Sequence, residues 1–304
     1  MPPAQHKTPL IPFAVATAGI ALFSTMDAVM KGLSITIGAY NALLWRTMAG
    51  TVLGGTMFLV RRRPWPARAA IRLHLARGLL SAVMAILFFW GLARVPLAQG
   101  VALAFIAPLI ALYLAALHLH ESIARRAIFA SMLGFAGVLV ILSGQARAHL
   151  GPEALRGALA ILASALLYAW NIVLMRKQAL VAGPVEIAFA MSLVMSLCFL
   201  AAAPWLAVFP ATPHLPAVGA AALLAFASLM LLSWAYARAE AQHLAPVEYS
   251  AFVWASLFGL VIFHEPVRPA TLAGAALIVT ACLIAARARP DPGPVPVADV
   301  EAAI

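Results

Sequence analysis

Long apolar stretches alternate with short polar segments along almost the whole chain. A stretch of about 20 apolar residues is long enough to cross the hydrocarbon core of a membrane as a helix. Backbone polar groups in lipid must be paired within the segment itself, so each such stretch is predicted to be helical. The predicted spans cover residues 12–30, 40–60, 73–93, 96–118, 125–143, 155–175, 184–206, 216–237, 243–263 and 269–286.

The order of polar and apolar positions repeats once within the chain. Residues 13–143, shifted forward by 144 positions, align with 157–287 without a gap. Self-similarity at a fixed offset indicates a duplicated architecture, here with five predicted spans in each copy. The matching pairs include Ala93-Arg94 with Ala237-Arg238, His120-Glu121 with His264-Glu265, and Met26-Asp27 with Trp170-Asn171.

The duplication predicts how the chain is organised. We expect an N-terminal cytoplasmic segment (1–11), a first five-helix repeat (12–143), a linker (144–154), a second five-helix repeat (155–287) and a disordered cytoplasmic tail (288–304). Because each copy has an odd number of spans, the second copy enters the membrane from the opposite side. The predicted fold is an all-α polytopic membrane protein of ten transmembrane helices in two inverted five-helix repeats, an architecture typical of secondary transporters.

Composition supports a membrane protein and argues against a nucleic-acid-binding one. The 304 residues are 64% hydrophobic and 10% charged, too apolar for a soluble domain to cover its surface. The net charge of +10 lies in the loops rather than on one face, as a nucleic-acid site would need. Placing both termini in the cytoplasm leaves only Lys31, Arg94, Arg147, Arg156 and Arg268 in outside segments, which satisfies the positive-inside rule.

These features resemble the EamA-type drug/metabolite transporter superfamily, over about residues 10–287. The resemblance rests on the two sets of five spans and on Trp45-Arg46, Pro108, Glu121, Trp170-Asn171 and Glu265. It implies both termini inside, in agreement with the charge distribution. Within the superfamily the amino-acid and metabolite exporters are most similar, which implies a carrier in the inner membrane of a bacterium.

Candidate substrate-binding residues are the polar and aromatic side chains inside the spans. A charge at membrane depth is costly, so it faces a cavity or a partner. Aromatic rings with a few amide and carboxylate groups suit small zwitterions such as amino acids, and they suit many drugs as well. The candidates are Asp27, Trp90, Gln99, Tyr168, Trp170, Asn171, Trp234, His243, Glu248 and Tyr249.

Several of these candidates have a second interpretation. Asp27 lies four residues before Lys31 and at the depth of Arg46, so a local ion-pair cluster is the alternative to contact with substrate or a coupling proton. Trp90 and Trp234 also fit the aromatic belt at the membrane surface. Tyr168 and Trp170 lie too deep for that belt, and Glu248 has no basic residue near it in sequence.

A second group is predicted to be structural or part of a charge network: Arg46, Arg77, Glu121 and Glu265. Each of the two glutamates precedes a helix whose N-terminal dipole favours an anion. His118 and His120 precede Glu121, but residues two apart point to different faces of a helix, so no metal site is predicted. Small residues, including Gly134, Gly137 and Gly274, predict close packing of spans 125–143 and 269–286 against each other, with a dimer surface as the alternative.

The sequence therefore predicts a secondary transporter that exports amino acids, aromatic ones included, or related small metabolites by alternating access, and it leaves the oligomeric state open, with a monomer plausible. Its partners are the small-molecule substrate and the lipid bilayer, with no cofactor, metal or nucleic acid. HExxH and GxSxG motifs are missing from the sequence, which argues against an enzyme. The alternatives are an exporter of drugs, nucleosides or sugars, and a channel or a non-transporting scaffold.

Overall fold

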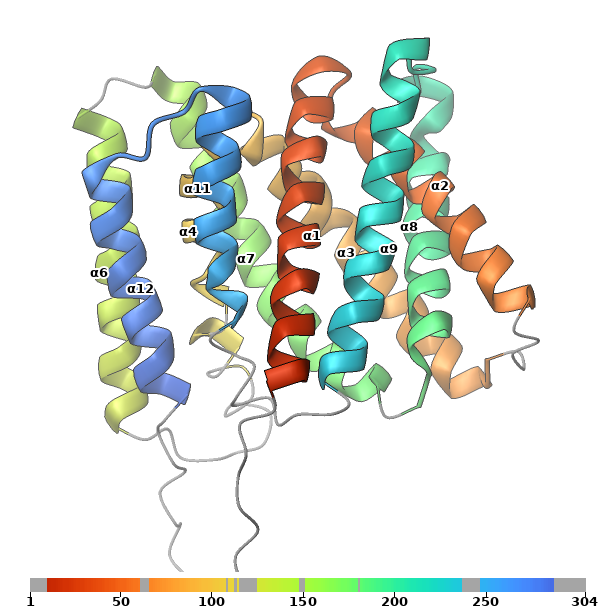
Figure 1. The fold of residues 1–304 in the computed structure, drawn as a ribbon, viewed down its shortest axis with the longest axis horizontal. Helices are drawn as coiled ribbons and strands as arrows, with labels where there is room; N and C mark the ends of the chain where they lie inside the picture. Colours follow the sequence, from red (N-terminus) through yellow and green to blue (C-terminus); the bar gives the residue numbers. More distant parts are fainter. Residues whose placement is uncertain are drawn as a thin grey trace, which may run out of the picture.

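Helices make up nearly all of the chain that the structure, a computed structural model, describes (Figure 1). The described residues are 10–60, 66–107, 109–111, 114, 125–147, 151–179, 181–236 and 247–286. Within these ranges the chain forms ten α-helices and a short 3-10 turn, Thr212–His214, without a β-strand. The predicted all-α class is confirmed.

The helices fall into two sets that follow the sequence duplication. In the first half they are α1 (Leu10–Thr36), α2 (Ala39–Val60), α3 (Arg68–Leu92), α4 (Leu97–Ala104) and α6 (Arg125–Arg147). In the second half they are α7 (Gly151–Ala179), α8 (Pro184–Leu206), α9 (Leu215–Tyr236), α11 (Ser250–Phe263) and α12 (Pro269–Ala286). Eight of the predicted spans thus correspond to a helix over most of their length.

Six of the described helices are long and apolar enough to cross a membrane, judged by length and composition. They cover Ile11–Thr36, Ala39–Val60, Ala70–Leu92, Gly151–Met175, Pro184–Leu206 and Thr212–Leu232. The helices Ser250–Phe263 and Pro269–Ala281 are apolar but shorter. Apolar side chains such as Leu79 and Leu223 point outward from the bundle, as expected for a protein solvated by lipid.

The predicted spans 96–118 and 243–263 are not single regular helices over their described parts. In α4 the hydrogen-bond pattern changes at Phe105, whose N–H donates to the carbonyl of Ala102 at 3.2 Å instead of one residue further back. Regular α11 begins only at Ser250, after Tyr249. Phe105 and Tyr249 are separated by the repeat offset of 144 residues, so both halves are interrupted at the same place.

Helix packing also follows the duplication. Helix α3 packs on α7, and the equivalent pair α9 and α1 packs in the same way. Two further pairs join a helix to its own counterpart: α2 with α8, and α6 with α12. Helix α4 also packs on α11, which lies in the equivalent predicted span but covers its other part. The helix contacts of one half are thus repeated in the other.

Small residues allow the closest of these contacts. A Cβ atom added at Gly137 of α6 would lie 2.7 Å from the carbonyl oxygen of Gly274 in α12. One added at Gly157 of α7 would lie 2.9 Å from the carbonyl oxygen of Gly91 in α3. The predicted packing of spans 125–143 and 269–286 is thereby confirmed as a contact within the chain.

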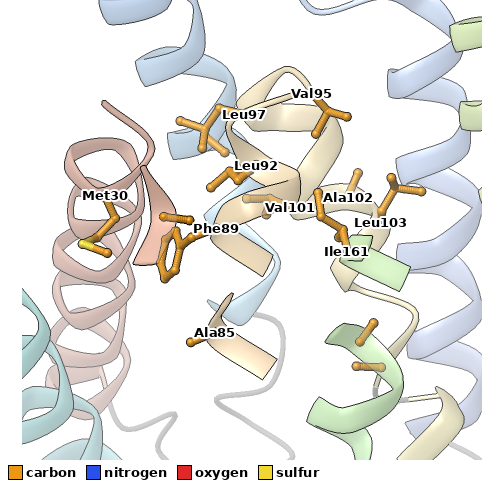
Figure 2. Close-up of a cluster of buried hydrophobic side chains, with 14 of the residues drawn as sticks. Met30, Ala85, Phe89, Leu92, Val95, Leu97, Val101, Ala102, Leu103 and Ile161 are labelled. Carbon is orange, nitrogen blue, oxygen red and sulfur yellow. The ribbon is translucent and has the colours of Figure 1, made fainter. Parts of the chain in front are cut away.

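The largest buried cluster takes residues from all ten described α-helices, and Figure 2 shows its part around α1, α3, α4 and α7. Leu92, Leu97 and Leu103 have no exposed surface, and Ile161 of α7 reaches the same cluster. The short turn between α3 and α4 is therefore held between helices of both halves. This packing fixes the N-terminus of α4, which belongs to the site described next.

Candidate functional site

The two helix interruptions meet where the two halves touch, and this contact is the centre of the candidate site. The rings of Phe105 and Tyr249 pack edge to face, with centroids 5.4 Å apart and planes at 89°. Phe105 and Tyr249 are equivalent residues of the two halves. Interrupted helices near the midplane are where many transporters bind their substrates, because the ends of such helices expose backbone polar groups.

Ionisable side chains from several helices gather around this centre. The hydroxyl of Tyr168, in the middle of α7, is within electrostatic reach of Glu248 beside the α11 interruption, Arg77 of α3 and Asp27 of α1. Tyr168 keeps 40% of its surface exposed, and Glu248 is also exposed. Tyr168 is thus an exposed side chain in electrostatic reach of charged groups from three other segments. The structure thus brings together four residues that are far apart in sequence.

Asp27 does not form the local ion-pair cluster that its spacing suggests. Lys31, one turn further along α1, points to Glu265 instead. Arg46 of α2 acts on Asp27 electrostatically, but neither residue takes part in the ion pairs of the described chain. Asp27 is only 6% exposed, and its Oδ1 atom has no hydrogen-bond partner among the described residues; the same is true of Nε of Arg46.

Lys31 is the most deeply buried charge in this region, and its partners come from both halves. Its Nζ atom lies 2.5 Å from Oε1 of Glu265 and donates a hydrogen bond to the carbonyl of Val95 at 2.7 Å. The ring of Phe263 lies 4.9 Å from the same ammonium group. The Lys31 ammonium group therefore has a charged, a polar and an aromatic partner, and it joins α1 to the segment before α12.

Glu265 stabilises a different helix from the one predicted. We expected its carboxylate to favour the helix that follows it, α12. Instead Oε2 accepts a hydrogen bond from the N–H of Leu97, the first residue of α4, at 2.8 Å. His264, which ends α11 in the left-handed conformation (φ 55°), turns the chain so that Glu265 reaches across to the other half. A carboxylate at a helix N-terminus is favourable, so the physical argument holds for α4.

A second polar cluster, the α3–α7 network, joins His74, Arg77, Ser81, Asn171, Gln178 and Glu186. Arg77 donates from Nε to Oδ1 of Asn171 at 3.0 Å and from a terminal nitrogen to Gln178. Asn171 donates to Oγ of Ser81 at 2.5 Å. His74 contacts Gln178 through Nδ1 at 2.5 Å and Glu186 of α8 through Nε2 at 2.9 Å.

The α3–α7 network changes the picture of two predicted residues. Arg77, expected in a charge network, is in one. Asn171, expected to contact substrate, is 2% exposed and has both ends of its amide hydrogen-bonded within the network, which favours a structural role in this conformation. The sequence carried a signal for this network: His74, Arg77 and Ser81 follow one another at spacings of three and four, which places them on one face of a helix.

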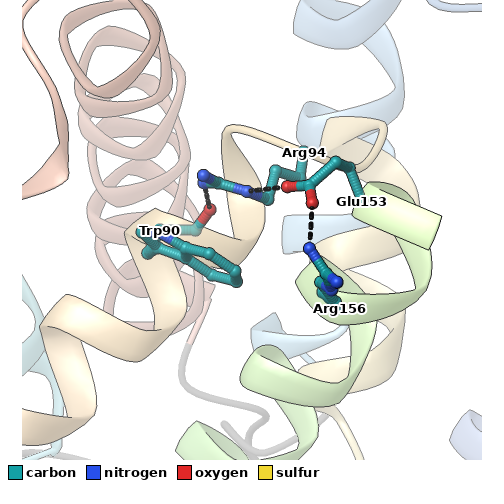
Figure 3. A network of polar contacts seen from close by, with 4 residues as sticks. All are labelled: Trp90, Arg94, Glu153 and Arg156. Atoms are coloured by element: carbon teal, nitrogen blue, oxygen red, sulfur yellow. Dashed lines mark hydrogen bonds and ion pairs between the residues drawn. The ribbon is translucent and has the colours of Figure 1, made fainter.

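The remaining described candidates lie nearer the ends of the helices. Trp90, at the end of α3, stacks under the guanidinium of Arg94, 3.6 Å from the ring centroid (Figure 3). Arg94 in turn pairs with Glu153, which also binds Arg156. Trp234, the counterpart of Trp90, is 37% exposed near the end of α9. Both positions fit a membrane-surface belt.

Gln99 is also placed away from the centre. It is 2% exposed and lines a small recess at the N-terminus of α4, together with Glu265, Arg268 and Thr271. Trp170 is half-buried in the middle of α7. Predicted residues His243 and Glu121 lie outside the described residues. Within the described part of the chain, histidine, cysteine and acidic residues form no cluster suited to a metal.

The fold and this centre define a class: a helical, multi-pass membrane protein built from two equivalent halves. Residues 11–143 and 155–287 each match the EamA-like transporter family. These matches cover most of the chain, which therefore belongs to that family, the EamA-type branch of the drug/metabolite transporters. The family points to a transporter rather than an enzyme.

Curated relatives are similar over much of their length. The pseudopaline exporter CntI of Pseudomonas aeruginosa is 28% identical, over 88% of this chain and 93% of its own. The S-adenosylmethionine uptake transporter of Rickettsia bellii is 28% identical, over 69% of this chain and 70% of its own. A solved crystal structure that is 22% identical covers 92% of this chain and 99% of its own with a TM-score of 0.59, which supports the fold.

Proposed function

We propose that the protein is a secondary carrier that exports amino acids or related small metabolites across the inner membrane of a bacterium by alternating access. The observation that carries this proposal is the meeting of Phe105 and Tyr249, equivalent residues at equivalent interruptions, amid charged side chains from several helices. A carrier needs a central site that each half can close in turn, and two similar halves around such a site provide this.

We further propose ten membrane crossings in two inverted repeats with both termini in the cytoplasm. In support, α1 begins and α12 ends at the same end of the bundle, and α6 and α12 run in opposite directions (Figure 1). The helix ends that carry Arg68 and Lys177 also lie at the end where α1 begins. A cytoplasmic location of that end agrees with the positive-inside rule.

Two relatives support a small metabolite as substrate. One is named as an exporter and another as an uptake transporter, each of a named metabolite. Export is the direction we propose, because the exporter matches more of this chain. The mixture of Tyr168, Glu248, Asp27 and Arg77 at the centre favours a substrate that carries charge as well as apolar surface.

The test is transport by the purified full chain in proteoliposomes. We expect counterflow of a labelled substrate that saturates and is stimulated by unlabelled substrate inside, in a screen of amino acids, nucleosides, sugars and drug cations. Conductance that does not saturate would indicate a channel. A chain that moves none of these compounds and binds none would contradict the carrier function.

The central residues are tested in the same assay. Glu248→Gln and Trp170→Ala are expected to lower the transport rate or the apparent affinity for the best substrate. Glu248 lies beside the interruption at Tyr249, and Trp170 lies two residues after Tyr168 in α7. Asn171→Ala is expected to act mainly through the α3–α7 network. Unchanged kinetics in all three variants would show that the substrate path lies elsewhere. Glu153→Gln, which is 57% exposed at its side chain, is the matched control.

A further inference from the structure

Asp27 and Arg46 form an unusual pair because they are opposite charges held near each other without contact. They lie on neighbouring helices that pack together, each about two turns from the end where α1 meets α2. Asp27 is 94% buried, and Oδ1 has no hydrogen-bond partner among the described residues. Nε of Arg46 lacks one as well. Buried charged groups without hydrogen bonds are costly, so such positions are retained where a partner binds.

Groups nearby do not satisfy Asp27. Lys31, the other cation on α1, is held by Glu265 and by the carbonyl of Val95. Arg77, which is in electrostatic reach of Tyr168, gives its hydrogen bonds to Asn171 and Gln178. The Asp27 carboxylate and the Arg46 guanidinium thus remain the two opposite charges at this depth that have hydrogen-bonding capacity left in the described chain.

The second half has no equivalent of this charged pair. The counterpart of Asp27 is Asn171, whose amide is hydrogen-bonded at both ends within the α3–α7 network. The counterpart of Arg46 is Ala190, which carries no charge. The pair therefore occurs in the first half alone, and it has been built at positions where the second half is neutral. A one-sided pair of opposite charges would give a bound molecule a single orientation.

From this arrangement, which rests on the proposed carrier function, we infer that Asp27 and Arg46 bind the two ends of a zwitterionic substrate. The Asp27 carboxylate accepts hydrogen bonds from the substrate's ammonium group, and the Arg46 guanidinium donates to its carboxylate. The fork of an arginine matches the two oxygens of a carboxylate. A substrate with a free ammonium and a free carboxylate bridges the two side chains, which form no ion pair with each other in the described chain. Tyr168, in electrostatic reach of Asp27, is the nearby ring for its apolar part.

The experiment measures competition in the proteoliposome counterflow assay. The probe is the L-amino acid that gives the largest counterflow. It is compared with its N-acetyl derivative, which lacks the ammonium charge, and its amide, which lacks the carboxylate. We expect each derivative to compete at least about tenfold more weakly than the parent, the size of one charge-assisted hydrogen bond.

The two side chains are then assigned by variants. Asp27→Asn is expected to weaken the parent amino acid about tenfold or more while leaving competition by the N-acetyl derivative unchanged. Arg46→Gln is expected to weaken the parent amino acid about tenfold or more while leaving competition by the amide derivative unchanged. Arg46→Lys keeps the charge but loses the fork, so it should fall between wild type and Arg46→Gln. Glu153→Gln, an exposed carboxylate-to-amide change, should alter none of these values.

Stability measurements keep the result interpretable. Asp27→Asn removes a buried charge that lacks hydrogen bonds, so the variant should unfold in detergent at a temperature no lower than wild type. If Arg46→Gln alone fails to fold, the Asp27→Asn/Arg46→Gln double variant removes both charges together and should fold. Equal weakening of parent and derivatives in every variant would overturn the inference and assign the pair to the scaffold.

The same screen separates failure of the inference from failure of the carrier function. Saturable counterflow of nucleosides, sugars or drug cations, with no counterflow of any zwitterion, would overturn the inference and leave the carrier function standing. If no compound is moved or bound, the carrier function itself fails, and the inference fails with it.

Discussion

Lys31 of α1 forms an ion pair with Glu265, which lies 234 residues further along the chain, with 2.5 Å between Nζ and Oε1. The contact joins the first half to the second at the end of the bundle opposite the start of α1 (Figure 1). The Lys31 side chain is 2% exposed, whereas that of Glu265 is 23% exposed. The counterpart of Lys31 in the second half is Met175, so this bridge is a feature of one half alone.

Glu265→Gln is expected to destabilise the protein by about 3 kcal/mol or more, because the buried Lys31 ammonium loses its charged partner. Lys31→Met, which introduces the residue found in the other half, should cost less, since Glu265 still accepts from Leu97. The double variant should lose less than the two single losses together. Unfolding in detergent micelles gives all three values, and simple additivity would show that the two residues do not interact.

Asn171→Ala is expected to cost about 1–2 kcal/mol, because hydrogen bonds between helices in membranes are each modest. Arg77→Leu should cost more, since it leaves Asn171 and Gln178 without a donor. Ser34→Ala is the control: Ser34 is the counterpart of Gln178, and its buried hydroxyl has no partner among the described residues. A loss for Ser34→Ala as large as that for Asn171→Ala would argue against the α3–α7 network.

Gly137→Ala is expected to destabilise the contact between α6 and α12 by about 1–3 kcal/mol, because the added methyl group would lie 2.7 Å from a backbone carbonyl. Gly219→Ala in α9 is the matched control, since nothing lies within 4 Å of a Cβ atom there. That change should be neutral or stabilising by up to about 1 kcal/mol. Thermal unfolding in detergent measures both, and equal effects would contradict the close packing.

Glu153→Gln is expected to leave the stability nearly unchanged, although Glu153 binds both Arg94 and Arg156 (Figure 3). Its side chain is 57% exposed, so water and salt screen both ion pairs. The stacking of Arg94 on Trp90 should survive the change, because it does not involve the carboxylate. A loss as large as that for Glu265→Gln would mean that exposure does not govern these contacts.

The sequence predicted most helices because their signal is local. An apolar stretch of sufficient length has few alternatives to a helix in lipid, and this holds whatever the neighbouring helices do. It failed at Phe105 and Tyr249, where apolar residues continue but the helix does not. Hydropathy alone does not locate such an interruption, although a proline lies three residues from each, Pro108 and Pro246, and proline disfavours a regular helix. Only the structure shows that the two rings pack on each other.

The partners of the polar residues were harder to predict than their positions. Spacing along α1 suggested that Asp27 would meet Lys31, but that lysine turns to Glu265. Asn171 was identified as polar at depth, yet only its contacts with Arg77 and Ser81 place it in the α3–α7 network. Polar side chains in a membrane form hydrogen bonds and ion pairs across helix interfaces, and helix packing determines which interfaces exist.

By itself the sequence determined the helical class, the duplication at an offset of 144 and the family resemblance, because these follow from composition and from order along the chain. The tertiary structure alone decided which charges are paired. It joined Lys31 to Glu265 and left Asp27 and Arg46 without hydrogen bonds to their buried atoms. The physical reason is that pairing depends on which helix faces meet, and residues that meet can be more than two hundred positions apart.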